Sequence, residues 1–600
     1  MRSLVPFIPL VLACILPFTH AAKESFDEEL VIKPLKDGKL FTHFQFTTRL
    51  NYEPTGDALF SHYGLFPKAI GQIIQQYGAR ELHLTFTQGR WNYENWGYPI
   101  AQSAGTGVEL WAWMYRTENL ESNWKALTNA LSGLFCASLN FIDETITSRP
   151  RMSFRPEGFY NEYADTMHER YDGLEDDSEL RYGSLPHESV CTENLTPWIK
   201  LLPCKAKAGA STLLNAHKLY DTNFHSMAIH IRPICMDANC DRKQLELVQT
   251  VTSVFDPVRV TARRDWSLQS LFDRKIEKSC AVASHSRVLV MLPAAEEGVT
   301  WHIIPSTNET MMLKVGEDTR QIAVYDLAKV EGPFDLQMIW QENAFPFPLK
   351  PSYPLFFAHR YFTGYGQERG GLTVNIVNQS PNDTMPVIYF DSIPWYLKLY
   401  LHTLKVSVVG REDEKQDDLV LQTYYQPAID RSRPSILEMR LSLPPNSITT
   451  VSIEFDKVFL KYTEHRPDAN RGFDVGSAVL TTWIPNGGAD LIAPGNLEHA
   501  LAYNDGNGSI FGSLQPIRIY TETLLVSLPT PDFSMPYNVI TLTCTVIALF
   551  FGSMFNLLTR SFVILQEEEK KAEGKSGKVK GGDAHDLVRP DVGPKEGSYN

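Results

Sequence analysis

Residues 437–455 read LEMRLSLPPNSITTVSIEF and carry the clearest fold signal in the chain. On both sides of the central PPNS segment, apolar residues alternate with polar ones, as is typical of strands with one buried face. Proline, asparagine and serine are common turn residues. The stretch therefore predicts two β-strands, residues 437–443 and 448–455, joined as a β-hairpin.

Alternating runs of the same kind occur elsewhere in the chain, at residues 225–231, 245–254, 287–292, 299–304 and 322–325. Earlier in the chain, residues 66–77 and 120–134 repeat apolar side chains at helical spacing, and residues 81–86 and 108–113 resemble strands. The predicted fold class is mainly β with an N-terminal α/β part. We expect β-sandwich-like domains followed by one C-terminal transmembrane helix.

The chain has 600 residues, of which 43% are hydrophobic and 21% are charged, so it is long enough for several packed domains. The predicted organisation is a signal peptide at 1–22, a lumenal α/β segment at 23–160, an acidic loop at 161–190, a lumenal β domain at 191–345, a second lumenal β-sandwich domain at 346–537, a transmembrane helix at 538–559 and a cytosolic tail at 560–600. The formal net charge of −14 argues against nucleic acid as a partner.

The two ends of the chain predict its topology. Arg2 precedes an apolar run at residues 4–18, and small residues follow, as in a cleaved secretory signal. Residues 539–558 form a second apolar run without a charge, and Arg560, Lys570 and Lys571 lie after it. By length and by the positive-inside rule this is a single span with a cytosolic carboxyl end, so we expect a type I membrane protein.

Six of the eight cysteines should face the oxidising lumen, namely Cys136, Cys191, Cys204, Cys235, Cys240 and Cys280. Most of them should form disulfides. Cys235 and Cys240 could close a hairpin, and Cys191 could bridge locally to Cys204. No second Cys or His pair completes a zinc site, so we expect no metal.

Three Asn-x-Ser/Thr sequences predict N-glycosylation, at Asn308, Asn382 and Asn507. At Asn194 and Asn378 a following proline disfavours it. The predicted span carries one stripe of small and polar residues, which would let another helix pack closely in lipid. The stripe consists of Thr541, Cys544, Thr545, Ala548, Gly552 and Asn556.

Motifs for catalysis and for cofactor binding are missing: there is no G-x-S-x-G, H-E-x-x-H, Walker or G-x-G-x-x-G sequence. We therefore expect no cofactor and no catalytic residue. A cysteine nucleophile with His62 or His225 as its base is conceivable, but lumenal cysteines are usually bonded.

Several long segments are familiar, among them SHYGLFPKAIGQII (61–74), FCASLNFID (135–143), SVCTENLTPWIKLLPCKAKAG (189–209) and LPTPDFSMPYNVITLTCTV (528–546). They resemble the PIG-T subunit family of the GPI transamidase complex, and the similarity extends from about residue 40 to 562. The tail after Gln566 has no recognisable pattern.

The resemblance implies a non-catalytic scaffold subunit in the endoplasmic reticulum membrane. Its partners would be a caspase-like catalytic subunit, which carries the nucleophile, the other membrane subunits of the complex, and the GPI lipid. The family's intermolecular disulfide to the catalytic subunit corresponds to Cys191. The family's contacts with the GPI head group correspond to Asn470, Asp532, Ser534 and Asn538.

Two hypotheses from other classes compete with this one. An independent type I glycoprotein acting as a receptor or adhesion ectodomain would have the same signal, glycans, sandwiches and span. A hydrolase acting alone would show turnover as a purified chain.

Overall fold

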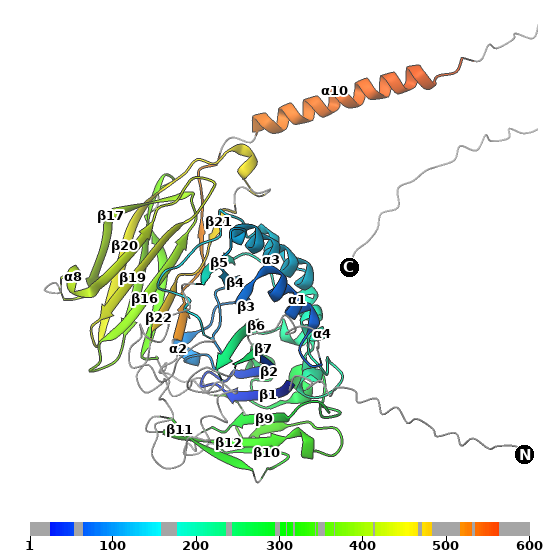
Figure 1. The fold of residues 1–600 in the computed structure, drawn as a ribbon, viewed down its shortest axis with the longest axis vertical. Helices are drawn as coiled ribbons and strands as arrows, with labels where there is room; N and C mark the ends of the chain where they lie inside the picture. Colours follow the sequence, from blue (N-terminus) through cyan, green and yellow to red (C-terminus); the bar gives the residue numbers. More distant parts are fainter. Residues whose placement is uncertain are drawn as a thin grey trace, which may run out of the picture. The chain divides into compact units, whose positions relative to one another are not determined.

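The computed structural model describes residues 24–562, except 53–63, 158–176, 236–242, 294–299, 308, 316–317, 343, 346–353, 365, 412–414, 466–467, 469–470, 483–516 and 531–533. The chain forms two units, Met1–Thr530 and Pro531–Asn600, which are described separately. Figure 1 shows the fold.

A ten-stranded sheet forms the centre of the first unit. In spatial order its strands are β11 (Thr310–Val315), β12 (Asp318–Asp326), β9 (His285–Met291), β1 (Glu24–Pro34), β2 (Leu40–Tyr52), β7 (Lys243–Phe255), β6 (Phe224–Cys235), β3 (Ala79–Gln88), β4 (Gly107–Tyr115) and β5 (Ser178–Leu185). Neighbouring strands are antiparallel except β1 and β9, which are parallel. The sheet thus joins strands that begin as far as 294 residues apart in sequence, at Glu24 (β1) and Asp318 (β12).

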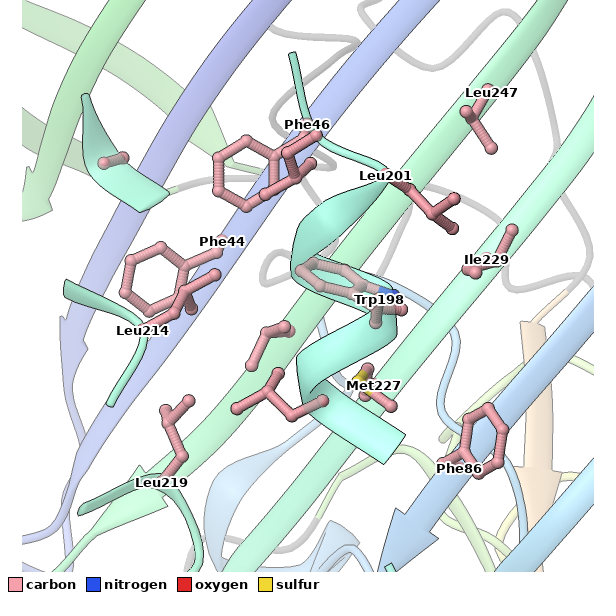
Figure 2. Packing of buried hydrophobic residues seen from close by; sticks show 14 of the residues in the cluster. Phe44, Phe46, Phe86, Trp198, Leu201, Leu214, Leu219, Met227, Ile229 and Leu247 are labelled. Atoms are coloured by element: carbon pink, nitrogen blue, oxygen red, sulfur yellow. The ribbon is translucent and has the colours of Figure 1, made fainter. Parts of the chain in front are cut away.

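Helices cover one face of this sheet, chiefly α1 (Lys68–Tyr77), α3 (Leu120–Phe135) and α4 (Thr192–Lys200) (Figure 1). Their apolar side chains share one buried cluster with the sheet, because each helix has an apolar stripe that must leave water. Figure 2 shows Trp198 of α4 among Phe46, Leu201 and Ile229. The helices and strands predicted between residues 66 and 134 are confirmed.

Short elements complete this part of the fold. They are α2 (Tyr93–Trp96), η1 (Ser138–Phe141), η2 (Ala210–Leu213), α5 (Ala216–Leu219), α6 (Pro257–Thr261), α7 (Leu268–Phe272), η3 (Leu327–Lys329) and a small sheet of β10 (Trp301–Ile304), β13 (Gln337–Trp340) and β8 (Trp266–Ser267).

The second part of this unit is a β-sandwich. One sheet contains β14 (Phe356–Thr363), β15 (Arg369–Asn378), β20 (Ser447–Lys457) and β17 (Leu397–Val408); the other contains β18 (Val420–Gln426), β19 (Ser435–Leu443), β16 (Met385–Ile393), β22 (Val479–Thr482) and β23 (Ile517–Tyr520). Also present are a ribbon of β21 (Phe473–Val475) and β24 (Leu524–Val526), α8 (Gln416–Leu419) and η4 (Tyr462–Glu464). The sandwich predicted here is confirmed.

The predicted hairpin is wrong, although both of its strands form. β19 pairs with β16 and β18, whereas β20 pairs with β15 and β17, so the PPNS segment crosses from one sheet to the other. Leu441 and Val451 both lie in the core between the sheets. The alternation shows only that each strand has one buried face. It is the same whether the next strand hydrogen-bonds to it in one sheet or packs against it from the other sheet.

Two further expectations for the first part differ from the structure. Its strands form one sheet covered by helices, not a second sandwich, because α1, α3 and α4 already bury one face of the sheet. Residues 178–185, expected within the acidic loop, form β5, which pairs with β4 along its length. Strands from both predicted lumenal segments, 23–160 and 191–345, share this sheet.

The second unit contains α10 (Ser534–Thr559). Its segment Tyr537–Thr559, 23 residues long, is apolar enough to cross a bilayer, and it is the candidate span among the described residues. The predicted C-terminal helix is therefore confirmed.

Candidate functional site

Cys191 caps the amino end of α4 and is partly exposed with a free thiol. Its backbone N–H donates to Asn194 Oδ1 at 2.8 Å, and Tyr220 Oη donates to its carbonyl oxygen at 2.6 Å. Burial raises the pKa of Tyr220, so this hydroxyl stays protonated and keeps donating. Both backbone groups of Cys191 are thus hydrogen-bonded, which fixes the position of its Cα and so of its side chain.

Trp198 anchors α4 to the sheet. Its indole is fully buried, and its Nε1 donates to the carbonyl oxygen of Ala228 in β6 at 3.1 Å. The ring meets Phe46 edge-on at 6.1 Å (Figure 2). Because the helix cannot move without breaking these contacts, Cys191 stands on a rigid element.

Asn194 joins the start of α4 to the end of α3. Its side chain is 1% exposed, and its Nδ2 donates to the carbonyl oxygens of Phe135 at 2.9 Å and Cys136 at 3.2 Å. They belong to the last residue of α3 and to its C-cap, where a helix offers its carbonyls no partner of its own. The same burial leaves no room for a glycan at Asn194, and Asn378, also 1% exposed, is enclosed in the same way.

The structure pairs Cys204 with Cys280, with Cα atoms 6.0 Å apart. The local bridge from Cys191 to Cys204 is therefore wrong: Cys204 is taken by a partner 76 residues away. Cys136 and Cys191 are free, and Cys136 is exposed. The predicted closure by Cys235 and Cys240 falls outside the described side chains.

The residues that the family resemblance assigns to the GPI head are only partly described. Asn470 and Asp532 lie outside the described residues, and the side chain of Ser534 at the start of α10 is also outside them. Asn538 lies exposed in the first turns of α10. Phe473 pairs with Val526, so the chain enters β21 and leaves β24 at the same end of this ribbon.

The stripe predicted for helix packing lies on α10, and all its members are exposed in this chain. The hydroxyls of Thr541 and Thr545 donate to the carbonyl oxygens of Tyr537 and Thr541, at 2.8 and 2.7 Å. They are thus satisfied within the helix, as lipid demands. Its packing role stays a prediction.

Among the predicted glycan acceptors, Asn382 is exposed between β15 and β16. Asn308 and Asn507 lie outside the described residues. Glycosylation at all three positions stays a prediction.

Sequence reasoning missed a buried ionic cluster where the sheet meets the sandwich. His83 Nε2 lies 2.8 Å from Glu81 Oε1, and Arg518 Nη1 donates to Glu157 Oε1 at 2.8 Å. Burial opposes ionisation of Glu157, but Arg518, His83 and Arg232 outweigh it and hold its pKa below the usual range. Because Arg518 and Glu157 are 361 residues apart, no local pattern could have revealed the pair.

Nothing in the described part of the chain gathers three or more His, Cys, Asp or Glu side chains in a form that could hold a metal ion. His225, considered above as a base, is buried with its ring 4.8 Å from that of Tyr220, and burial lowers its pKa to about 4. His62 lies outside the described residues. Among the described residues the site at Cys191 thus has neither a metal cluster nor His225 as a base, and it consists of a partly exposed thiol on a rigid helix.

Fold and site together define a class: a large, mainly β protein with an unpaired surface cysteine and one candidate membrane span near its carboxyl end. The model of the Gpi16 subunit family, a GPI transamidase component, matches residues 10–265 and 257–582. The chain belongs to this family.

Its relatives agree along almost the whole chain. The human GPI-anchor transamidase component PIGT is 43% identical over 588 residues, which cover 96% of this chain and 97% of that protein. The GPI transamidase component GPI16 of Saccharomyces cerevisiae is 33% identical and covers 91% of this chain and 90% of that protein. A solved collagen adhesin from S. aureus, 9% identical, covers 40% of this chain and 83% of that chain with a TM-score of 0.16, which is too low to support an argument.

Proposed function

We propose that this chain is the non-catalytic scaffold subunit of GPI transamidase. It holds the caspase-like catalytic subunit through a disulfide at Cys191 and through noncovalent contacts, and it helps position the GPI lipid for attachment to proproteins. It spans the endoplasmic reticulum membrane once, with the bulk of the chain in the lumen. The family assignment favours this hypothesis over an independent receptor.

The observation that carries the proposal is the state of Cys191. Its thiol is unpaired and partly exposed, on a helix anchored by Trp198. Cys204 is bonded to Cys280, so it cannot compete for Cys191. A disulfide from a fixed point lowers the entropic cost of keeping a partner chain in one orientation.

The ribbon of β21 and β24 supports the lipid-positioning role. Asn470 precedes β21 by three residues and Asp532 follows β24 by six, and the register Phe473 with Val526 brings the chain into and out of the ribbon at one end. A carboxylate attracts the amine of ethanolamine, and amide and hydroxyl groups bond phosphate oxygens.

Non-reducing electrophoresis of the assembled complex tests the tether. We expect a band at the combined mass of this chain and a partner, which Cys191→Ser abolishes, while co-purification of the partner persists through noncovalent contacts. Cys136→Ser is the matched control, because Cys136 is the other free cysteine among the described residues of the first unit. The tether is refuted if the wild-type band is the same with and without reductant.

A further inference from the structure

One end of the β-sandwich is the end from which the chain continues to α10. In the β17–β20 pair, Leu397 lies opposite Lys457 at this end, and Val408 lies opposite Thr449 at the other. Leu397 shares a buried cluster with Val526 and Leu528, the last part of the chain before α10. We call this the span-proximal end.

Two large apolar side chains project into solvent at the span-proximal end. Phe459 is 69% exposed and lies two residues after β20, and Leu525 in β24 is 54% exposed. The two segments are linked: Val458 N–H donates to the carbonyl oxygen of Tyr396 at 3.0 Å, and the Tyr396 ring lies 5.3 Å from Phe473 of the neighbouring strand. A phenylalanine at this exposure costs solvation free energy unless something covers it.

The residues around Phe459 suit one kind of cover. Lys461 and Tyr462 are exposed, so the segment offers an aromatic ring, an amphipathic ring and a cation within four residues. This combination suits the headgroup region of a bilayer, where aromatic rings sit below the phosphates and lysine reaches them.

The length of the connection to α10 favours the bilayer over a distant partner. Eight residue steps separate Val526 from Ser534, and a fully extended chain covers about 3.6 Å per residue, so Ser534 lies within about 29 Å of Val526. The opposite end of the β17–β20 pair lies eight residues away along β20, from Lys457 to Thr449, or roughly 27 Å. When Tyr537–Thr559 spans a membrane, this short connection limits how far the span-proximal end can lie from it, and the opposite end is less restricted.

We propose that the span-proximal end rests on the bilayer, with Phe459 and Leu525 inserted among the lipid headgroups. Together with the span it gives the folded part a second point of membrane contact, which restrains its tilt. The inference depends on the span and not on the tether at Cys191.

Site-specific photocrosslinking in lipid vesicles tests this surface. A photoreactive phenylalanine analogue replaces Phe459 in the full chain, which is reconstituted in phosphatidylcholine vesicles containing phosphatidylserine. Val409 is the matched control, because it is 61% exposed and follows the opposite end of β17. We expect lipid adducts to be at least several-fold more abundant from position 459 than from position 409.

A second position guards against a local artefact. The analogue at Leu525 should also yield lipid adducts, and both positions are exposed enough to be replaced without disturbing the core. Equal labelling at 459 and 409 overturns the proposal. So does an assembled complex in which position 459 crosslinks to another polypeptide instead of lipid.

Discussion

At the scale of single residues, Glu28 shows how burial changes chemistry. It lies in β1 with no exposure, and its Oε1 accepts hydrogen bonds from Ser286 Oγ at 2.5 Å and from the N–H of Ala210 at 3.2 Å. A Cβ at Gly209, whose φ is +73°, would lie 2.0 Å from the same oxygen, so this position needs glycine. Burial raises the pKa of Glu28 to about 7.

This shift predicts a pH-dependent effect of Glu28→Gln. A carboxyl whose folded-state pKa is raised above 4.5 contributes stability fully below pH 4.5, and that contribution is lost as the pH rises through 7. Glutamine mimics the protonated form and does not ionise. The unfolding free energy of the variant minus that of wild type should therefore be up to about 3 kcal/mol higher at pH 8 than at pH 4.5.

Urea unfolding of the detergent-solubilised full chain at pH 4.5 and pH 8 measures this difference. The same substitution at the exposed Glu454 is the matched control. A wild-type and variant pair whose difference is the same at both pH values would contradict the assignment.

At the scale of elements, α4 positions Cys191 because Asn194 ties the helix to the end of α3. Asn194→Ala removes the acceptor for the Cys191 N–H and the donor for two carbonyl oxygens. Leaving these buried groups unpaired should cost about 2–3 kcal/mol of unfolding free energy.

Two measurements check this prediction, namely denaturant unfolding and the rate at which a maleimide modifies Cys191. The rate should rise, because the start of α4 loses its restraint. Thr196→Ala, on the exposed side of the same helix, is the control. An unchanged modification rate together with unchanged stability would show that Asn194 does not hold the site.

Elements also show why the hairpin prediction failed. β19 and β20 have the expected bounds within a few residues, because alternation and turn residues are local properties. β19 pairs with β16 and β18, and β20 pairs with β15 and β17, and the local pattern does not encode this choice. Likewise, a sequence motif singles out Cys191. That Cys204 does not bond to it depends on Cys280, which the fold brings close to Cys204.

At the scale of the whole molecule, several buried titratable groups in the ten-stranded sheet together determine how stability changes at acidic pH. Burial lowers the pKa of His43 and His225 to about 4 and, as the main cause, that of His230 to about 3. Each is neutral in the folded protein but takes a proton in the unfolded chain below about pH 6.5. The unfolded state then binds more protons, so stability falls as the pH drops from 6.5 toward 3.

The carboxyls determine the shape of this pH dependence. Glu28 and Glu109, whose pKa values burial raises to about 7, oppose the histidines between pH 7 and 4.5. Below pH 4.5 that opposition ends, and Glu157, with its lowered pKa, now also loses stabilisation. Stability should therefore decline gently from pH 6.5 to 4.5 and steeply below it.

Thermal unfolding of the full chain from pH 7 to pH 3 measures this curve. His43→Gln, which still offers polar atoms to Thr252, should reduce the slope between pH 6.5 and 4. A melting temperature that stays constant down to pH 4 would refute the account.

The sequence by itself determined the mainly β class, the α/β helices, the sandwich strands, the apolar span and the family, because periodicity, length and motif are written along the chain. The tertiary structure decided which strands pair, which cysteines bond, and that Glu157 meets Arg518. Those outcomes depend on contacts between residues up to hundreds of positions apart, and local patterns are the same for many such pairings.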